Sequence, residues 1–297
     1  MWNSMRQACH SGNRRRPVAL FVALAALIVG GVIYRHEIAA SVRAFDGWCC
    51  RQAGREAWGR WVKREDWSSV PPASGYDFGW LDKPYPLRIA HALGESKSAG
   101  QNSLSAAESS IAAGFVLLEV DVWRDAQGRL WCRHGADPSD ESNEHVGARE
   151  CELAELLSLI RRRPGVRLVP DIKSDFESTA VALILSAASQ GLADRLVMQL
   201  YEPDHLRLFE AWHRRWPLPG PIVTTYRARR PIWRIEQAIQ SLGYRAIALP
   251  YDDLAFVDPP PEGFHLLIHP VHDCARQREL LRQGLDIGFT LHALKCP

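Results

Sequence analysis

Residues 87–122, LRIAHALGESKSAGQNSLSAAESSIAAGFVLLEVDV, carry the pattern that decides the fold. A short apolar run at 87–92 is followed by a helix-like stretch at 103–113 and then by a second apolar run at 115–122. Short runs rich in apolar or β-branched residues are typical of buried strands. A strand, a helix and a second strand in this order indicate a parallel βαβ unit.

The same alternation continues along the rest of the chain. Strands are expected at 87–92, 115–122, 166–172, 195–201, 221–226, 245–251, 264–270 and 286–292. Helices are expected between them at 103–113, 151–162, 177–189, 204–212, 232–242 and 274–283. This pattern predicts an α/β fold, a TIM (β/α)₈ barrel. Because the last strand ends near the end of the sequence, we expect a segment before the first strand to cover the place of the eighth helix.

An apolar segment precedes the barrel. Residues 17–34, PVALFVALAALIVGGVIY, contain no charged side chain, and a helix of this length spans about 27 Å, close to the thickness of a bilayer core. The run is longer than the roughly 7 to 15 apolar residues of a cleaved signal peptide, which is the alternative, so we favour a transmembrane anchor. Arg6 and the cluster at 14–16 precede it. The positive-inside rule therefore places the barrel on the extracytoplasmic side of the plasma membrane, the periplasmic side in a bacterium.

Four segments follow from this organisation. They are a cytoplasmic N-terminus at 1–16, a transmembrane anchor at 17–35, a juxtamembrane helical segment and linker at 36–85, and the barrel at 86–297. In the third segment Trp58 and Trp61 share one face of a helix. This face suits either the membrane interface or the floor of the barrel. We favour packing against the barrel, and interpret 71–75, PPASG, as a linker.

Composition excludes some classes of function. The 297 residues are 46% apolar and 24% charged, with a formal net charge of +2, which is the balance of an ordinary globular protein. No nucleic-acid partner is expected, since the positive cluster lies before the anchor. Among seven cysteines, Cys132 and Cys151 bracket a polar segment and would pair in an oxidising compartment. Buried free thiols fit the sequence equally well, and no cysteine or histidine spacing indicates zinc.

Acidic residues gather at the carboxyl ends of the predicted strands, where a TIM barrel has its active site. Glu119 and Asp121 lie two residues apart on one strand, so their side chains point to the same face. Asp171 ends the next parallel strand. Buried anions of this kind need a cation, and carboxylate oxygens suit Ca²⁺ or Mg²⁺. The alternative is a purely structural pair with Lys or Arg.

Two histidines are predicted to border these acids. His91 ends the first strand, and His134 follows a turn at 125–128 that returns the chain to the same rim. Imidazole titrates in the range needed to take a proton from an attacking oxygen and to deliver one to a leaving alkoxide. Two histidines beside a carboxylate cluster therefore favour phosphodiester chemistry over a structural role.

The stretch 89–135 resembles the N-terminal signature of the glycerophosphodiester phosphodiesterase family. In that signature a strand-end histidine, an asparagine before the first helix, a Glu-x-Asp strand and a second histidine follow in this order, and residues 170–173, PDIK, are a weaker echo of a later motif. The resemblance implies that His91 and His134 are the acid/base pair. It implies that the metal ligands are Glu119, Asp121 and Asp171.

Further implied roles concern the substrate phosphate. The resemblance assigns Lys173 to a phosphate contact, while Asn102 has two interpretations: the N-cap of the helix beginning at 103, or a hydrogen bond to metal or phosphate. The sequence also departs from the family pattern. Ala92 replaces the usual arginine after the first histidine, as in a His-Ala variant subgroup, and Asp171 replaces the commoner glutamate.

Together these features predict a membrane-anchored, metal-dependent phosphodiesterase acting on a small-molecule or lipid-headgroup phosphodiester, such as a glycerophosphodiester or a (lyso)phospholipid. Two alternatives remain open: a sphingomyelinase D-like or phosphatidylinositol phospholipase C-like lyase that forms a cyclic phosphate, and a catalytically silent barrel that binds phospholipid. His269 and His292, at the ends of the last two strands, are candidates for the pocket lining. The other histidines of the barrel, His213, His265 and His272, are expected at the surface or in the core.

Overall fold

The computed structural model describes residues 70–73, 75–82, 86–94, 100–136, 151–225, 232–256 and 260–290. These residues belong to one compact unit, which spans 65–228 and 232–297. The predicted cytoplasmic segment, the predicted anchor and the tryptophan stretch lie outside the described residues. Among the helices that are described, none has the length and apolarity needed to cross a bilayer.

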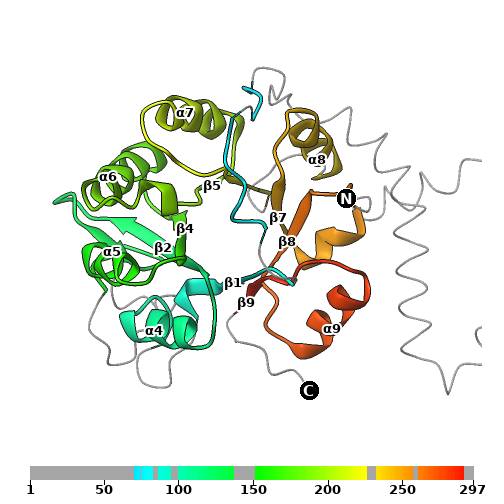
Figure 1. The fold of residues 1–297 in the computed structure, drawn as a ribbon, viewed down its shortest axis with the longest axis horizontal. Helices are drawn as coiled ribbons and strands as arrows, with labels where there is room; N and C mark the ends of the chain where they lie inside the picture. Colours follow the sequence, from blue (N-terminus) through cyan, green and yellow to red (C-terminus); the bar gives the residue numbers. More distant parts are fainter. Residues whose placement is uncertain are drawn as a thin grey trace, which may run out of the picture. The chain divides into compact units, whose positions relative to one another are not determined.

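Parallel strands alternate with helices along this unit, and Figure 1 shows the helices arranged around the strands. The parallel strands are β1 (Arg88–Ala90), β2 (Leu117–Arg124), β4 (Arg167–Ile172), β5 (Gln199–Leu200), β6 (Ile222–Thr224), β7 (Ala246–Pro250), β8 (His265–His269) and β9 (Gly288–Thr290). The α-helices are α4 (Leu104–Ala112), α5 (Leu153–Arg161), α6 (Phe176–Ser189), α7 (Pro203–His213), α8 (Ile232–Ser241) and α9 (Cys274–Arg282). Short 3₁₀-helices are η2 (His91–Leu93), η4 (Ala193–Arg195) and η5 (Tyr251–Phe256). Each predicted strand and helix has its counterpart, and the TIM-barrel-like α/β architecture is confirmed.

The barrel does not close by hydrogen bonds into one continuous sheet. The strands form two sheets. The first has the order β3-β2-β1-β9, where β3 is Leu130–Cys132, and β4 pairs with β2 outside this order. The second has the order β5-β6-β7-β8. The prediction of a closed (β/α)₈ barrel is therefore corrected to a TIM-barrel-like fold with two seams. One seam separates β4 from β5, and the other separates β8 from β9.

The two seams differ in their local structure. The β4/β5 seam coincides with a very short strand, and at the β8/β9 seam the two backbones lie close together without the hydrogen bonds of a strand pair. β5 has only two residues, and a single bridge between Leu168 and Leu196 links the chain before it to β4. At the other seam Gly288, with φ of +73°, lies so close to β8 that a Cβ atom there would be 2.3 Å from the backbone nitrogen of Ile268. The two backbones are thus packed together, and the Val271 N–H donates to the Phe289 carbonyl at 2.8 Å just beyond the strands.

A β-hairpin extends β2 beyond the barrel. The strand β3 (Leu130–Cys132) pairs antiparallel with β2 after the turn at 125–128 that the sequence predicts. Asp125 holds the turn, because its carboxylate accepts from the backbone of Gln127 and Arg129. A disulfide joins Cys132 to Cys151, with Cα atoms 5.2 Å apart. The pairing left open by the sequence is therefore the one the structure adopts.

Residues 70–73 and 75–82 pack against the segments that precede β6 and β7. The Ala73 N–H donates to the Leu242 carbonyl at 2.7 Å, just before β7, and the Trp80 indole N–H donates to the Gly220 carbonyl at 2.8 Å, just before β6. Figure 1 shows this segment passing between α7 and α8. Trp80 is fully buried. Within the stretch interpreted as a linker, Ala73 is buried and hydrogen-bonded to the barrel.

Candidate active site

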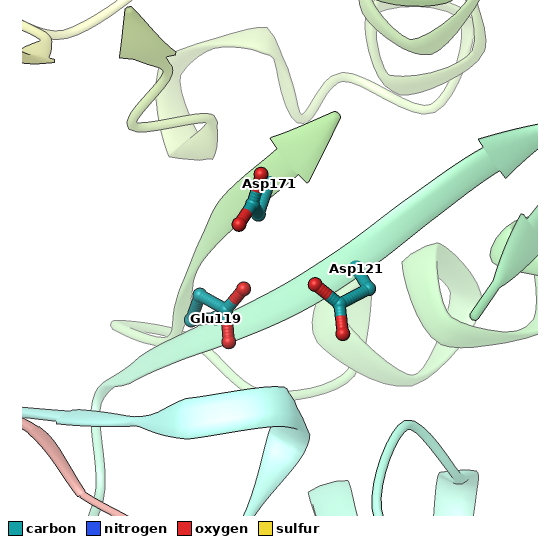
Figure 2. Close-up of side chains that lie close together, drawn as sticks. All are labelled: Glu119, Asp121 and Asp171. Carbon is teal, nitrogen blue, oxygen red and sulfur yellow. The ribbon is translucent and has the colours of Figure 1, made fainter. Parts of the chain in front are cut away.

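Three carboxylates meet at the carboxyl ends of two neighbouring strands. Asp121 on β2 is paired in register with Asp171 on β4. Glu119 lies two residues before Asp121 and therefore on the same face of the sheet. The three side chains point toward one another (Figure 2), and one ligand oxygen from each lies within 4.8 Å of the others. Their exposed fractions are only 1% for Glu119, 6% for Asp121 and 3% for Asp171.

Lys173 and Asn102 bind this carboxylate cluster directly. The Lys173 ammonium lies 2.7 Å from Asp171 Oδ2 and 3.1 Å from Asp121 Oδ1. The Asn102 amide donates to Asp121 Oδ2 at 2.8 Å, and its oxygen accepts from the Asp121 N–H at 3.1 Å. Asn102 is not the N-cap of α4, because Ser103 holds that position and accepts from the Ala106 N–H at 3.1 Å. Both polar atoms of Asn102 instead orient Asp121.

Two further contacts to the cluster were not expected from the sequence. The Tyr201 hydroxyl, just after β5, donates to Asp171 Oδ1. The Ala92 N–H donates to Glu119 Oε2. The turn that makes this contact is unusual, because Ala92 and the following Leu93 have φ of +49° and +65°, a region that L residues rarely occupy. The backbone at position 92 thus serves a carboxylate, at the place where the family pattern has an arginine side chain.

The electrostatics of the carboxylate cluster favour a bound cation. Burial, together with the charges of Asp121 and Asp171, raises the pKa of Glu119 well above its usual value. Burial also raises the pKa of Asp121, although Lys173 opposes it. Burial acts to lower the pKa of Lys173, but Asp121 and Asp171 outweigh it and the net shift is upward. One ammonium does not balance three carboxylates, so the cluster fits a divalent cation with oxygen ligands.

His91 is the first residue of η2, directly after β1. Its ring Nδ1 is buried and has no hydrogen-bond partner among the described residues. Burial lowers the pKa of His91 well below its usual value, and the nearby His269, His272 and Lys173 act in the same direction. The ring is therefore neutral at physiological pH.

His134 acts on the carboxylate cluster through its charge. It follows β3 and is exposed, and its charge lowers the pKa of Asp121. The charge of Lys173 lowers the pKa of His91, and the charge of Asp171 raises it. Both histidines named from the sequence are thus within electrostatic range of the carboxylate cluster.

Two more histidines border His91. His269 ends β8, and its ring centre lies 4.7 Å from that of His91 with the planes nearly perpendicular. The ring of His272 stacks on His91 with a centre-to-centre distance of 5.2 Å. His272 is half-buried and packs on His91, a contact that the sequence did not predict. His265 lies elsewhere, 2.6 Å from Asp286 at the amino-terminal ends of the strands, and His292 lies outside the described residues.

These features define a class: a TIM-barrel-like α/β protein with a buried acidic site at the carboxyl ends of its strands, bordered by histidines. A scan of family models and a search of curated proteins find no match to the sequence.

Several solved structures are similar to the fold of this chain. A glycerophosphodiester phosphodiesterase from Parabacteroides distasonis is 19% identical with a TM-score of 0.55, over 69% of this chain and 92% of that one. A glycerophosphodiester phosphodiesterase from Thermotoga maritima is 18% identical with a TM-score of 0.50, over 71% and 96%. The chain therefore has the TIM-barrel-like fold of glycerophosphodiester phosphodiesterases, and the resemblance seen in the sequence is confirmed at the level of the fold.

Proposed function

We propose that this protein is a metal-dependent phosphodiesterase that hydrolyses glycerophosphodiester or (lyso)phospholipid headgroup bonds. One observation carries the proposal: the buried oxygens of Glu119, Asp121 and Asp171 gather within 4.8 Å of one another. The electrostatic effects that link His91 and His134 to these carboxylates support it. The structural neighbours are glycerophosphodiester phosphodiesterases by name, which supports the same chemistry.

A divalent cation, Ca²⁺ or Mg²⁺, would be held by Glu119, Asp121 and Asp171. When bound, it supplies polarisation of the phosphoryl oxygens and compensation for their negative charge. Asn102 and Tyr201 orient Asp121 and Asp171 respectively. Lys173 adds a positive charge at the same place, as expected for a residue beside the phosphate.

The proton-transfer roles follow from the surroundings of the two histidines. His91 is neutral, and its ring Nδ1 has no hydrogen-bond partner in the part of the chain that the structure describes. It is therefore suited to accept the proton of the attacking oxygen. His134, on the exposed hairpin, is then the group that delivers a proton to the leaving alkoxide.

A cyclising lyase is the second candidate. Asp171 and Lys173 form the Asp-x-Lys pair that sphingomyelinase D-like and phosphatidylinositol phospholipase C-like lyases share with the phosphodiesterase pattern. Phosphorus NMR of the first product separates the two reactions, since a hydrolase yields a linear phosphomonoester and a lyase yields a cyclic ester. A barrel that only binds phospholipid would yield neither.

The location of the catalytic unit is part of the proposal. The apolar segment at 17–34 would anchor the chain in the inner membrane, with the barrel on the periplasmic side. The disulfide between Cys132 and Cys151 supports an oxidising compartment. Protease treatment of spheroplasts carrying the full-length chain tests this, since a barrel on the cytoplasmic side would be protected.

The decisive experiment assays the purified protein on glycerophosphodiesters, lysophospholipids and phosphatidylinositol, with and without chelator. We expect chelation and the double variant His91→Ala/His134→Ala each to abolish cleavage, a loss of at least about 10²-fold for each proton-transfer group. His213→Ala, which removes an imidazole at the end of α7, serves as the control and should remain active. Full activity in the double variant would refute the proposal.

A further inference from the structure

His134 lies just beyond the short hairpin strand that extends from the barrel. The strand β3 pairs with β2 over three residues only, and this pairing ends at Cys132, two residues before His134. How the structure holds Cys132 therefore bears directly on where His134 lies.

Cys132 is attached on its other side to the start of α5. A disulfide joins it to Cys151, and its backbone N–H donates to the Cys151 carbonyl at 2.8 Å. An isolated antiparallel bridge pairs the neighbouring residues Trp131 and Glu152. Both cysteines are buried, and α5 begins two residues after Cys151, at Leu153, with its apolar side chains in the core. The end of β3 is thus fastened between a barrel strand and a helix that packs on the barrel.

The chain that leaves this point runs toward the carboxylate cluster. Antiparallel pairing places Cys132 opposite Val122, so the chain beyond Cys132 leads back along β2 in the direction of Asp121. The effect of the His134 charge on the pKa of Asp121 agrees with this direction. The two residues from Cys132 to His134 span at most about 7 Å, so a displacement of Cys132 is passed on to His134 with little slack.

The carboxylate cluster has its own supports. Its three carboxylates are oriented by Asn102, Tyr201 and the backbone N–H of Ala92. These partners lie outside the hairpin and outside α5. Loss of the attachment at Cys132 should therefore leave the cation site intact and affect the placement of His134.

We propose that the disulfide between Cys132 and Cys151 positions His134 for proton delivery, which makes the two cysteines positioning residues of the phosphodiester reaction. The inference rests on the proposed function for the role of His134. A chain that folds without this disulfide should still bind the metal and the substrate. It should lose turnover of those diesters whose leaving group needs a proton.

The rival explanation is that the disulfide only stabilises the fold. A cross-link stabilises a protein mainly by restricting its unfolded chain, and its loss would then lower activity toward every substrate alike. Misplacement of a proton donor is selective instead. The alkoxide of glycerol needs a proton to leave, whereas p-nitrophenolate leaves without one, because p-nitrophenol is a far stronger acid than an aliphatic alcohol.

The test compares Cys132→Val/Cys151→Ala, which removes the disulfide and fills its space with apolar side chains, with His134→Ala. With Mg²⁺ present, we expect kcat for a glycerophosphodiester to fall by about 10²-fold in the disulfide-free variant, as in His134→Ala, at nearly unchanged KM. Cleavage of bis(p-nitrophenyl) phosphate should stay within a few-fold of wild type in both. Equal losses on the two substrates, or no loss on either, would overturn the inference.

Two further variants control for stability and folding. Ile239→Ala opens a cavity at a fully buried position of α8 and should lower neither rate, although it destabilises the fold. Insertion of one glycine between Cys132 and Arg133 keeps the disulfide but lengthens its link to His134. This insertion should give the same selective loss even if the disulfide-free variant does not fold. Wild-type turnover of the glycerophosphodiester by the insertion variant would overturn the inference.

A readout without catalysis keeps this inference distinct from the proposed function. Mn²⁺ bound at the carboxylate cluster should broaden the ring signals of His134 in proton NMR, because paramagnetic broadening falls steeply with distance. At equal Mn²⁺ occupancy the broadening should be several-fold weaker in Cys132→Val/Cys151→Ala. If the wild type cleaves neither substrate, the proposed function fails, while this difference still supports the positioning of His134. Unchanged broadening in the variant, or none in the wild type, would overturn the inference.

Discussion

At the scale of single residues, each carboxylate of the cluster is held by a partner from a different part of the chain. Glu119 is held by the backbone of η2, Asp121 by Asn102, and Asp171 by Tyr201. Such hydrogen bonds behind metal ligands fix their orientation and tune the affinity for the ion. Tyr201 is of special interest because Asp171 is one methylene shorter than the commoner glutamate, so its oxygens have less reach.

Removal of the Tyr201 hydroxyl should therefore weaken the cation site. We expect Tyr201→Phe to lower Mg²⁺ or Ca²⁺ affinity by about 10- to 100-fold, while the buried ring keeps the fold intact. Calorimetric titration of the metal measures this. Tyr244→Phe is a matched control, because it removes a hydroxyl that donates to the Pro71 carbonyl at 3.2 Å, away from the carboxylate cluster. An unchanged metal affinity in Tyr201→Phe would show that the hydroxyl does not orient Asp171.

At the scale of elements, the seam between β8 and β9 depends on one glycine. Gly288 combines a φ of +73° with a backbone approach that leaves no room for a side chain, since its Cβ would lie 2.3 Å from Ile268 N and 2.5 Å from Ile268 O. The atoms contacted belong to the backbone, which cannot relieve the overlap by a change of rotamer as a flexible side chain could. The packing of β9 against β8 is therefore intolerant of any other residue at this position.

Gly288→Ala should destabilise the protein more than an ordinary glycine substitution. The matched control is Gly284→Ala, at φ of +71° with open space around the Cβ. The left-handed conformation alone costs roughly 1–2 kcal/mol, which both variants share, and the steric overlap should add about 1–3 kcal/mol in Gly288→Ala. Urea denaturation gives the two free energies of unfolding. Equal losses would mean that β9 shifts away from β8 without cost.

At the scale of the whole molecule, the buried carboxylates link stability to pH and to metal. The pKa values of Glu119 and Asp121 are raised, so the folded metal-free protein holds protons that the unfolded chain releases. The change of the free energy of unfolding with pH is proportional to the difference between the number of protons bound by the unfolded chain and by the folded protein. The stabilisation is present below the ordinary carboxyl range and is lost as pH rises through the raised pKa values.

The metal-free protein should accordingly lose thermal stability between about pH 4.5, near the ordinary pKa of a carboxyl, and neutral pH. Because a cation competes with protons for the same oxygens, Mg²⁺ should raise Tm more at neutral than at acidic pH. Glu119→Gln removes one of the two titrations and should flatten the metal-free profile. Calorimetry with chelator and with Mg²⁺ checks all three statements. A shift in Tm on adding Mg²⁺ that is the same at both pH values would contradict the linkage.

The order of elements was predictable from local patterns. Apolar runs and helical spacing place the eight parallel strands and the six α-helices of the described unit within a few residues, because the period of the side chains depends only on near neighbours in the sequence. The strand β3 and the short 3₁₀-helices were not predicted. The two-residue period of a strand puts Glu119 and Asp121 on one face. The turn at 125–128 is predictable from the residues of the turn itself. The disulfide partner, the two seams and the contact of Ala73 with the barrel were beyond local patterns, since each depends on segments far apart in the chain.

Local sequence patterns are enough to specify the barrel-like alternation and the residue types available at its rim. Three contacts arise only when the chain is folded: the register that sets Asp171 beside Asp121, the hydrogen bond from the Tyr201 hydroxyl to Asp171, and the stacking of His272 on His91. The physical reason is that strand register and ring packing are chosen by the burial of the whole core. No stretch of a few residues contains that information, because the competing arrangements differ only in contacts between distant elements.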